Sequence, residues 1–341
     1  MSVLNEVFCV NLDIRIWSGR KKLTAADLQV SDASLPPKDL ATLGNKRICD
    51  PDTLKPFHRI EGRARDACLR VGVHFLSGYG VAKSKADELV DSLHKLREEF
   101  EKEKQALLGI YDEAVAEWVA AHPGWEHVLK DLVPREEAAA KLSFDFQTFA
   151  ILDPFASEVE ADDPKTNGAT QGLDRATQGL PDQLYSEIAV MAREAWKKSF
   201  VGKTSVTRKA LRPIKAAMVK LELMRFLDPV RIGALLVRIN QKLAEMPKSG
   251  PIEGNALNAI KGIAYALSDV QRLKMYAEHL EQGLPLDEAS LGRTEEIAVE
   301  LSNASFATDQ TDHAVAFEKL EPADAETTLP AVPPDPQSFY W

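Results

Sequence analysis

Residues 82–122, AKSKADELVDSLHKLREEFEKEKQALLGIYDEAVAEWVAAH, carry the most informative pattern of this chain. Its apolar residues repeat every seven positions, which is typical of a long helix that packs along one seam. At about 1.5 Å per residue, such a helix is roughly 60 Å long. The first seam position holds Ala86, Leu93, Phe100, Leu107 and Ala114, and the second holds Leu89, Leu96 and Ile110.

The sequence is compatible with two ways of packing this seam. A second copy of the chain or a partner helix would give a coiled coil and a homo-oligomer or complex through residues 82–122. The other packing is an antiparallel hairpin, in which the seam lies on the protein's own helices. Glu103 and Glu117 interrupt the second stripe, so the pattern does not choose between them.

Two alternating stretches flank the long helix. Residues 8–16 alternate strictly, and residues 142–147 alternate between apolar and polar side chains within the second stretch, 142–149, so both are predicted to be strands that could pair with each other. A helix is expected over 56–73, and Gly78-Tyr79-Gly80 is interpreted as its end and the turn into the long helix. The alternative is a flexible, glycine-flanked aromatic that serves a ligand in an enzyme of unrecognised type. The predicted fold class is mainly α, a helical protein with one long heptad-patterned helix and a small two-stranded β element.

Four regions follow from the changes in composition. We expect an N-terminal strand and long-helix region over 1–152, and a linker over 153–180 that contains a tandem repeat of Ala-Thr-Gln-Gly-Leu. Amphipathic helices are expected over 181–282. The region 283–341 carries 12 acidic and 2 basic residues, which accounts for the whole formal charge of −10. We interpret that region as a largely disordered tail.

The cellular compartment and the possible chemistry of the protein are inferred mainly from motifs that the sequence lacks. Cys9, Cys49 and Cys68 have no metal-ligand spacing and are expected to be small buried side chains in a reducing, cytoplasmic setting. No stretch is long and apolar enough to span a bilayer. Gly202-Lys203-Thr204 lacks the earlier glycine of a phosphate-binding loop, and no nucleophile elbow is present. His122 and His127 are separated by Pro123-Gly124, so they cannot share a helical face as metal ligands. We therefore expect a non-enzymatic protein without metal or cofactor.

The strongest chemical signal is a basic segment over 197–225, with nine basic residues and only Glu222 as an acid. Such a cluster neutralises phosphates or meets an acidic partner surface, although a solvated helix face has the same pattern. The candidate binding residues are Lys197, Lys198, Lys203, Arg208, Lys209, Arg212 and Lys215.

A second candidate contact lies at the other end of the acidic region. Phe339, Tyr340 and Trp341 follow a proline-containing acidic segment and form a candidate docking peptide for a partner protein.

Several segments together resemble a known family. They are residues 18–23, 35–40, 72–81, 184–188 and 226–229, with Gly-Leu-Pro just before the fourth. The set resembles the bacterial and phage family known as domain of unknown function 3150, over roughly residues 1–282. The resemblance implies a protein carried by mobile elements and phages. It also implies neighbours in the form of a MoxR-type AAA ATPase and a von Willebrand factor A-type protein.

From these patterns and this resemblance we expect a non-enzymatic accessory or adaptor protein that works with the ATPase. The alternative is a nucleic-acid-binding protein of element maintenance or recombination that uses the basic segment.

Overall fold

The computed structural model describes residues 3–30, 35–37, 39–130, 132–151 and 172–284, together with residues 287, 288, 290 and 291. The chain forms two units, 1–292 and 293–341, and the second lies wholly outside the described residues. The described part is mainly helical, as expected, but its β structure is larger than the sequence predicted.

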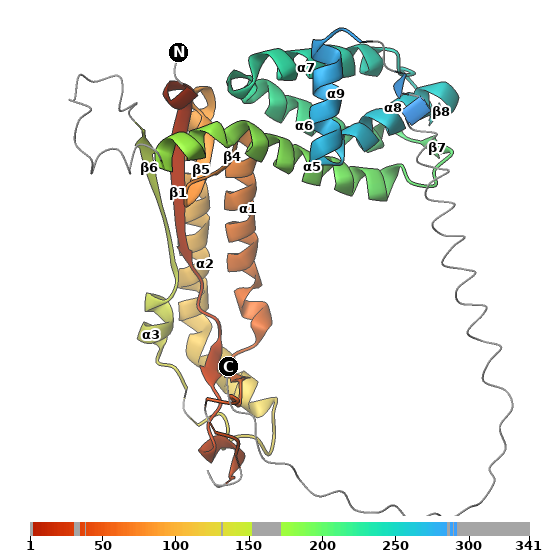
Figure 1. Cartoon of the computed structure of the whole chain (residues 1–341). Coiled ribbons are helices and arrows are strands. Elements are labelled where there is room, and N and C mark those ends of the chain that lie inside the picture. Colours follow the sequence, from red (N-terminus) through yellow and green to blue (C-terminus); the bar gives the residue numbers. More distant parts are fainter. Residues whose placement is uncertain are drawn as a thin grey trace, which may run out of the picture. The chain divides into compact units, whose positions relative to one another are not determined.

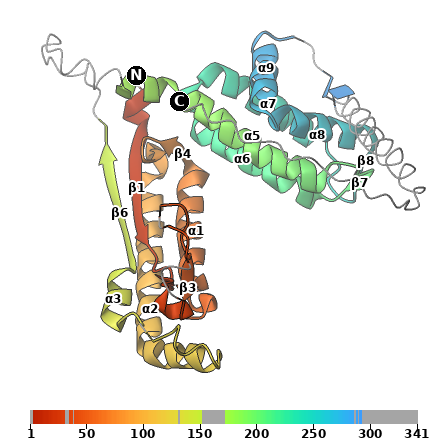
Figure 2. The same ribbon diagram turned by 60° about the horizontal axis from the view of Figure 1, so that its bottom comes forward.

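The main sheet has four antiparallel strands in the order β4-β5-β1-β6. The predicted pairing of the two alternating stretches is confirmed, since Phe8 of β1 lies opposite Ala150 of β6 and Arg15 opposite Ser143. Figures 1 and 2 both show β6 beside β1, with α2 behind them. The strands are β1 (Val7–Arg15), β4 (Gly72–Phe75), β5 (Gly78–Ala82) and β6 (Ser143–Ala150).

The prediction of a two-stranded element was wrong because β4 and β5 form a hairpin where a helix end was expected. Glycines are needed there for close approach of the backbones. A Cβ atom on Gly72 would lie 2.4 Å from the carbonyl oxygen of Gly80, and one on Gly78 would lie 2.4 Å from that of Val10. Short strands with several glycines carry little alternation, so they escape recognition in the sequence.

Substitution of Gly72 by alanine is expected to lower the free energy of unfolding by about 1–3 kcal/mol, because rigid backbone atoms must move away from the new methyl group. Gly109 is the matched control, since it lies on an exposed turn of the long helix and a methyl group there would meet nothing within 4 Å. Gly109→Ala is expected to raise the free energy of unfolding by about 0.5–1 kcal/mol. Urea unfolding followed by circular dichroism measures both, and equal effects would contradict the packing at Gly72.

The long helix α2 (Ala86–Ala120) has 35 residues and lies beside α1 (Lys55–Val71). The Phe57 ring of α1 meets Phe100 of α2 at 4.9 Å between ring centroids, and Phe144 of β6 lies 5.8 Å from Phe100. The expected seam therefore packs against the protein's own helix and sheet, which was one of the two open packings.

The heptad repeat does not continue to the end of α2. Ile110 is 52% exposed, whereas Tyr111 and Val115 are buried, so the buried stripe follows the 3.6-residue helix period past Leu107. A coiled coil needs the seven-residue spacing to persist. The structure thus has a long helix inside a hairpin and gives no support to the predicted coiled coil.

The helices after residue 171 pack around one core. Asp228 begins α7 by accepting a hydrogen bond from the Arg231 amide, and it also accepts one from the Tyr185 hydroxyl at 2.8 Å. This core also takes in Val7 and Val73 from the sheet. The helices are α5 (Leu180–Ser199), α6 (Arg212–Leu223), α7 (Pro229–Ala244), α8 (Gly254–Leu267) and α9 (Val270–Glu281).

The remaining short elements complete the described chain. The pairs β2–β3 and β7–β8 form two small sheets of their own. The four strands are β2 (Arg20–Lys22), β3 (Asn45–Arg47), β7 (Ser205–Val206) and β8 (Ile252–Glu253). The short helices are α3 (Arg135–Ala140) and the 3-10 helices η1 (Val3–Glu6), η2 (Ala26–Leu28), η4 (Pro51–Leu54), η5 (Lys83–Lys85), η6 (Arg208–Leu211) and η7 (Arg225–Leu227).

Two region predictions are only partly open to comparison. Most of the expected linker lies outside the described residues, but residues 172–178 are helical instead of forming a loop. The expected acidic tail is described only at its start, where Glu288 is 1% exposed. Arg238 donates a hydrogen bond to the Glu288 carboxylate at 2.6 Å. This charged partner explains how Glu288 can be buried although it belongs to the acidic region.

Candidate functional site

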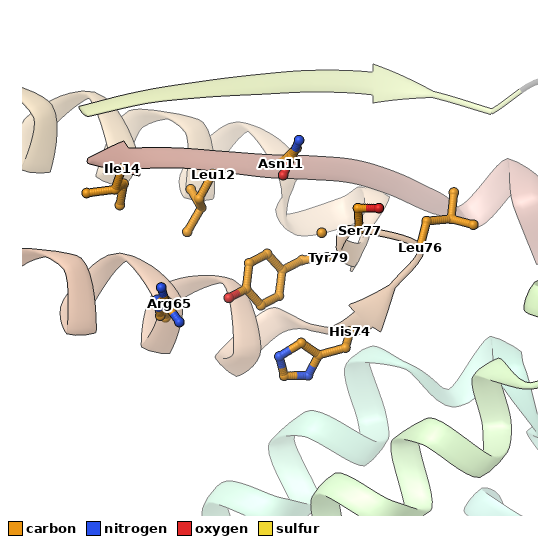
Figure 3. Close-up of a pocket in the computed structure, with 9 residues that line it drawn as sticks. Asn11, Leu12, Ile14, Arg65, His74, Leu76, Ser77 and Tyr79 are labelled. Carbon is orange, nitrogen blue, oxygen red and sulfur yellow. The ribbon is translucent and has the colours of Figure 1, made fainter. Parts of the chain in front are cut away.

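A polar pocket of about 350 Å³ lies beside β1, at the tip of the β4–β5 hairpin. Figure 3 shows the His74 and Tyr79 rings next to each other, below the part of β1 that carries Leu12 and Ile14. The two rings are 5.2 Å apart between centroids. The pocket is lined by Asn11, Leu12, Ile14, Arg65, His74, Leu76, Ser77, Gly78 and Tyr79.

The pocket exposes an edge of β1 that has no strand partner. On one side β1 pairs with β6 along residues 8–15, but on the other side its pairing with β5 covers only residues 7–10. The Val10 carbonyl points toward β5, because a Cβ atom on Gly78 would lie only 2.4 Å from its oxygen. Backbone direction alternates along a strand, so the N–H and C=O groups of Leu12 and Ile14 point to the same open side.

No other described residue satisfies these groups. The hydrogen bonds found among the described residues, outside regular helices and strands, include none to the backbone of Leu12 or Ile14. Both side chains are half-buried and pack on the core under the sheet, so they hold the edge in place. An unpaired strand edge of this kind is a template for another extended chain.

A buried ion pair fixes the hairpin to the helices that follow. Glu187 of α5 accepts from the His74 backbone amide at 2.9 Å and lies 2.8 Å from His74 Nδ1. Lys220 of α6 donates to Glu187 at 2.5 Å and to the Leu69 carbonyl at 2.7 Å. The Glu187 carboxylate therefore joins β4, α5 and α6, while Lys220 adds the end of α1.

Burial and ion pairing shift the pKa values of Glu187 and Lys220 in opposite directions. Burial raises the pKa of Glu187, but the charge and hydrogen bond of Lys220 and the bond from His74 outweigh it, so the pKa lies below its ordinary value. Burial lowers the pKa of Lys220, and Glu187 offsets part of that change. Glu187 is therefore ionised at neutral pH, and hydrogen bonds satisfy both groups of the pair.

The pocket presents hydrogen-bond donors at neutral pH. Burial raises the pKa of Tyr79, which keeps its phenol protonated. Arg65 pairs with Glu61 at 2.6 Å and its side chain is 60% exposed. The wall of the pocket thus suits an extended segment whose side chains carry acceptor groups.

The predicted basic residues all lie on the surface, but they do not form one uninterrupted helix face. Arg208 lies in η6, and α6 begins at Arg212 with Pro213 in its first turn. The exposed side chains are those of Lys197, Lys198, Lys203, Arg208, Lys209, Arg212 and Lys215.

Some members of the basic segment already have partners. Lys198 pairs with Glu194, and Arg208 donates to the Pro247 carbonyl at 2.6 Å. Lys220, which belongs to the same segment of sequence, is buried at 3% exposure. The structure brings Lys203 and Lys209 together, since both line one pocket.

The other sequence-based predictions divide between confirmed and untested. Cys9, Cys49 and Cys68 are free and buried, as expected, and burial raises the pKa of Cys9 to about 11 and of Cys68 to about 12. Phe339, Tyr340 and Trp341 lie outside the described residues, so their docking role stays a prediction.

Two kinds of site are absent from the described ranges. No three or more histidine, cysteine, aspartate or glutamate side chains gather there as a metal site would require. Among the helices that the structure describes, none has the length and apolar character needed to cross a membrane.

Sequence reasoning missed the open edge and the ion pair. The pattern over 8–16 predicts the strand but not which of its edges stays unpaired. His74 and Glu187 are separated by 113 positions, and no local pattern connects such residues. The one available signal was Gly78-Tyr79-Gly80, where glycines allow the close hairpin that stops short of residues 11–15.

Comparison with known proteins gives one result. A family model described as "Protein of unknown function (DUF3150)" matches residues 4–269. Neither the curated proteins nor the solved structures contain a match to the chain.

Proposed function

The chain belongs to the DUF3150 family, and on that premise we propose that it is a non-enzymatic adaptor of a mobile-element or phage system. In this proposal it works with a MoxR-type AAA ATPase and a von Willebrand factor A-type protein, the neighbours that the family resemblance implies. The adaptor holds an extended segment of the ATPase by adding it as a strand to the main sheet.

The observation that carries the proposal is the open edge of β1. Leu12 and Ile14 supply two N–H donors and two C=O acceptors on a strand that is already fixed by β6 on its other side. An extended segment adding there needs no rearrangement of the sheet. Strand addition of this kind uses backbone hydrogen bonds for affinity and flanking pockets for specificity.

The expected affinity is moderate. Each backbone hydrogen bond contributes about 0.5–1.5 kcal/mol net, so four contribute about 2–6 kcal/mol. Side-chain contacts in the pocket with His74, Tyr79 and Arg65 add to this value. A dissociation constant in the micromolar range corresponds to about 8 kcal/mol, so the side-chain contacts must supply the remainder and offset the cost of association.

Titration calorimetry of the full chain against the MoxR-type ATPase from the same genome tests the proposal. We expect a saturable complex at micromolar concentrations, unchanged after nuclease treatment of both proteins. Absence of binding at those concentrations would overturn the adaptor role.

A second candidate function is nucleic-acid binding, favoured by the seven exposed basic side chains between residues 197 and 215. The sequence has no acidic residue between Glu194 and Glu222, so this surface has no carboxylates from its own segment to neutralise it. Phosphate contacts of this kind make affinity fall steeply with salt concentration.

Charge reversal at Arg208, Lys209 and Arg212 tests the second candidate. If the protein binds DNA or RNA through this surface, the variant is expected to lose binding and to flatten the dependence of affinity on salt. Unchanged affinity of the variant for the same oligonucleotide would exclude this surface.

A further inference from the structure

A second pocket, of about 420 Å³, lies where the chain passes from α5 to α6. The chain leaves α5, turns at Gly202 with a φ of +66°, and enters the short strand β7. Pairing of Val206 with Ile252 of β8 holds this strand against the helical core. The pocket is lined by Ser199, Lys203, Ser205, Val206, Thr207, Lys209 and Ala210.

The lining is rich in hydrogen-bond donors. Lys203 and Lys209 each offer an ammonium group, and three hydroxyl side chains lie beside them. None of the described residues that line the pocket carries a carboxylate. Positive charge with hydroxyl donors and no acid is the chemistry that recognises a phosphoryl group.

The two lysines are uncommitted within the described part of the chain. No ion pair or side-chain hydrogen bond joins Lys203 or Lys209 to another described residue, whereas Lys198, Arg208 and Lys220 of the same segment all have such partners. The chain thus places two cations that are free to meet a ligand in the same pocket.

The apolar part of the lining is small. Among the described lining residues only Val206 and Ala210 are apolar, and none has an aromatic ring to stack on a base. Base–aromatic stacking is the usual source of affinity for unpaired bases. Recognition in this pocket is therefore directed to the phosphate and not to the base.

We infer that this pocket binds a phosphoryl group, with Lys203 and Lys209 as the charged contacts and Ser199, Ser205 and Thr207 as hydroxyl donors. The ligand is inorganic pyrophosphate, a terminal phosphate or a phosphate of a nucleic-acid backbone, which share this chemistry. The inference is independent of the adaptor role, because the pocket does not include any residue of the β1 edge.

The test is titration of the full chain with pyrophosphate and, separately, with a short oligonucleotide carrying or lacking a 5′ phosphate. The double variant Lys203→Ala, Lys209→Ala is expected to weaken binding of the preferred phosphate ligand at least tenfold. Binding of pyrophosphate or a gain from the 5′ phosphate identifies a terminal phosphate as the source. Binding of both oligonucleotides alike, without pyrophosphate binding, identifies the backbone.

Two further variants separate a built pocket from general attraction by the basic surface. Lys248→Ala removes an exposed charge that lies outside both the pocket and the seven candidate residues, and it is expected to change affinity less than twofold. Glu253 is exposed and lies opposite Ser205 in the β7–β8 pair, so Glu253→Gln is expected to tighten binding a few-fold. Equal losses in Lys248→Ala and the double variant, or no binding of any phosphate ligand by the wild type, would overturn the inference.

Discussion

Replacement of Lys220 by methionine is expected to lower the free energy of unfolding by about 3–5 kcal/mol. Methionine keeps much of the apolar stem of lysine but leaves the Glu187 carboxylate, which is 13% exposed, without its charged partner. It also removes the donor to the Leu69 carbonyl. A buried charge left in this state costs several kcal/mol, which is a large part of the stability of an ordinary domain. Urea unfolding followed by circular dichroism measures the change.

Two variants show whether this loss comes from the ion pair. Lys215→Met changes an exposed lysine of the same helix and is expected to alter the free energy of unfolding by less than about 0.5 kcal/mol. The double variant Glu187→Gln, Lys220→Met removes both charges and is expected to be more stable than Lys220→Met alone. If the double variant is as unstable as the sum of both single variants, the two residues do not act as a pair.

Replacement of Leu12 by proline is expected to weaken binding of the ATPase at least tenfold. Proline removes the Leu12 N–H, which points to the open side of β1, and its ring occupies the space that an added strand needs. The β1–β6 pairing does not use this N–H, because it faces away from β6. Proline is tolerated in strands at positions of this kind. Calorimetry with the same ATPase preparation measures the affinity.

Leucine to alanine at the same position is the matched control. Leu12 is half-buried, so both variants lose its packing on the core under the sheet. Only the proline variant loses the donor and blocks the edge, and Leu12→Ala is expected to keep affinity within about threefold. Circular dichroism checks that both variants remain folded. Equal affinities of the two variants would show that the edge is not the binding site.

The sequence predicted those parts of the fold that have a local period. The strand over residues 8–16, its pairing with the stretch over 142–149 and the long helix were recoverable because alternation or helical spacing persists over many residues. The apolar seam of α2 could also be predicted from the sequence, but the elements that pack against it could not. Phe57 and Phe144, which cover Phe100, lie on different elements far apart in the sequence.

The rest of the fold depends on contacts that have no local pattern. The hairpin β4–β5 has strands of 4 and 5 residues with glycines at close approaches, and such a sequence is equally typical of a helix end. In the sequence Lys220 is one more cation of a basic segment, although it is buried against Glu187. Only the tertiary structure separates this structural lysine from Lys203 and Lys209, which are exposed in a pocket.

Amide hydrogen exchange along β1, measured in the free protein and with saturating ATPase, shows whether a strand adds at this edge. The backbone N–H groups of Asn11 and Asp13 point to β6, so these amides are expected to exchange slowly in both states. Leu12 and Ile14 are expected to exchange fast in the free protein and at least tenfold more slowly in the complex. A complex in which Leu12 and Ile14 still exchange fast would contradict strand addition at this edge.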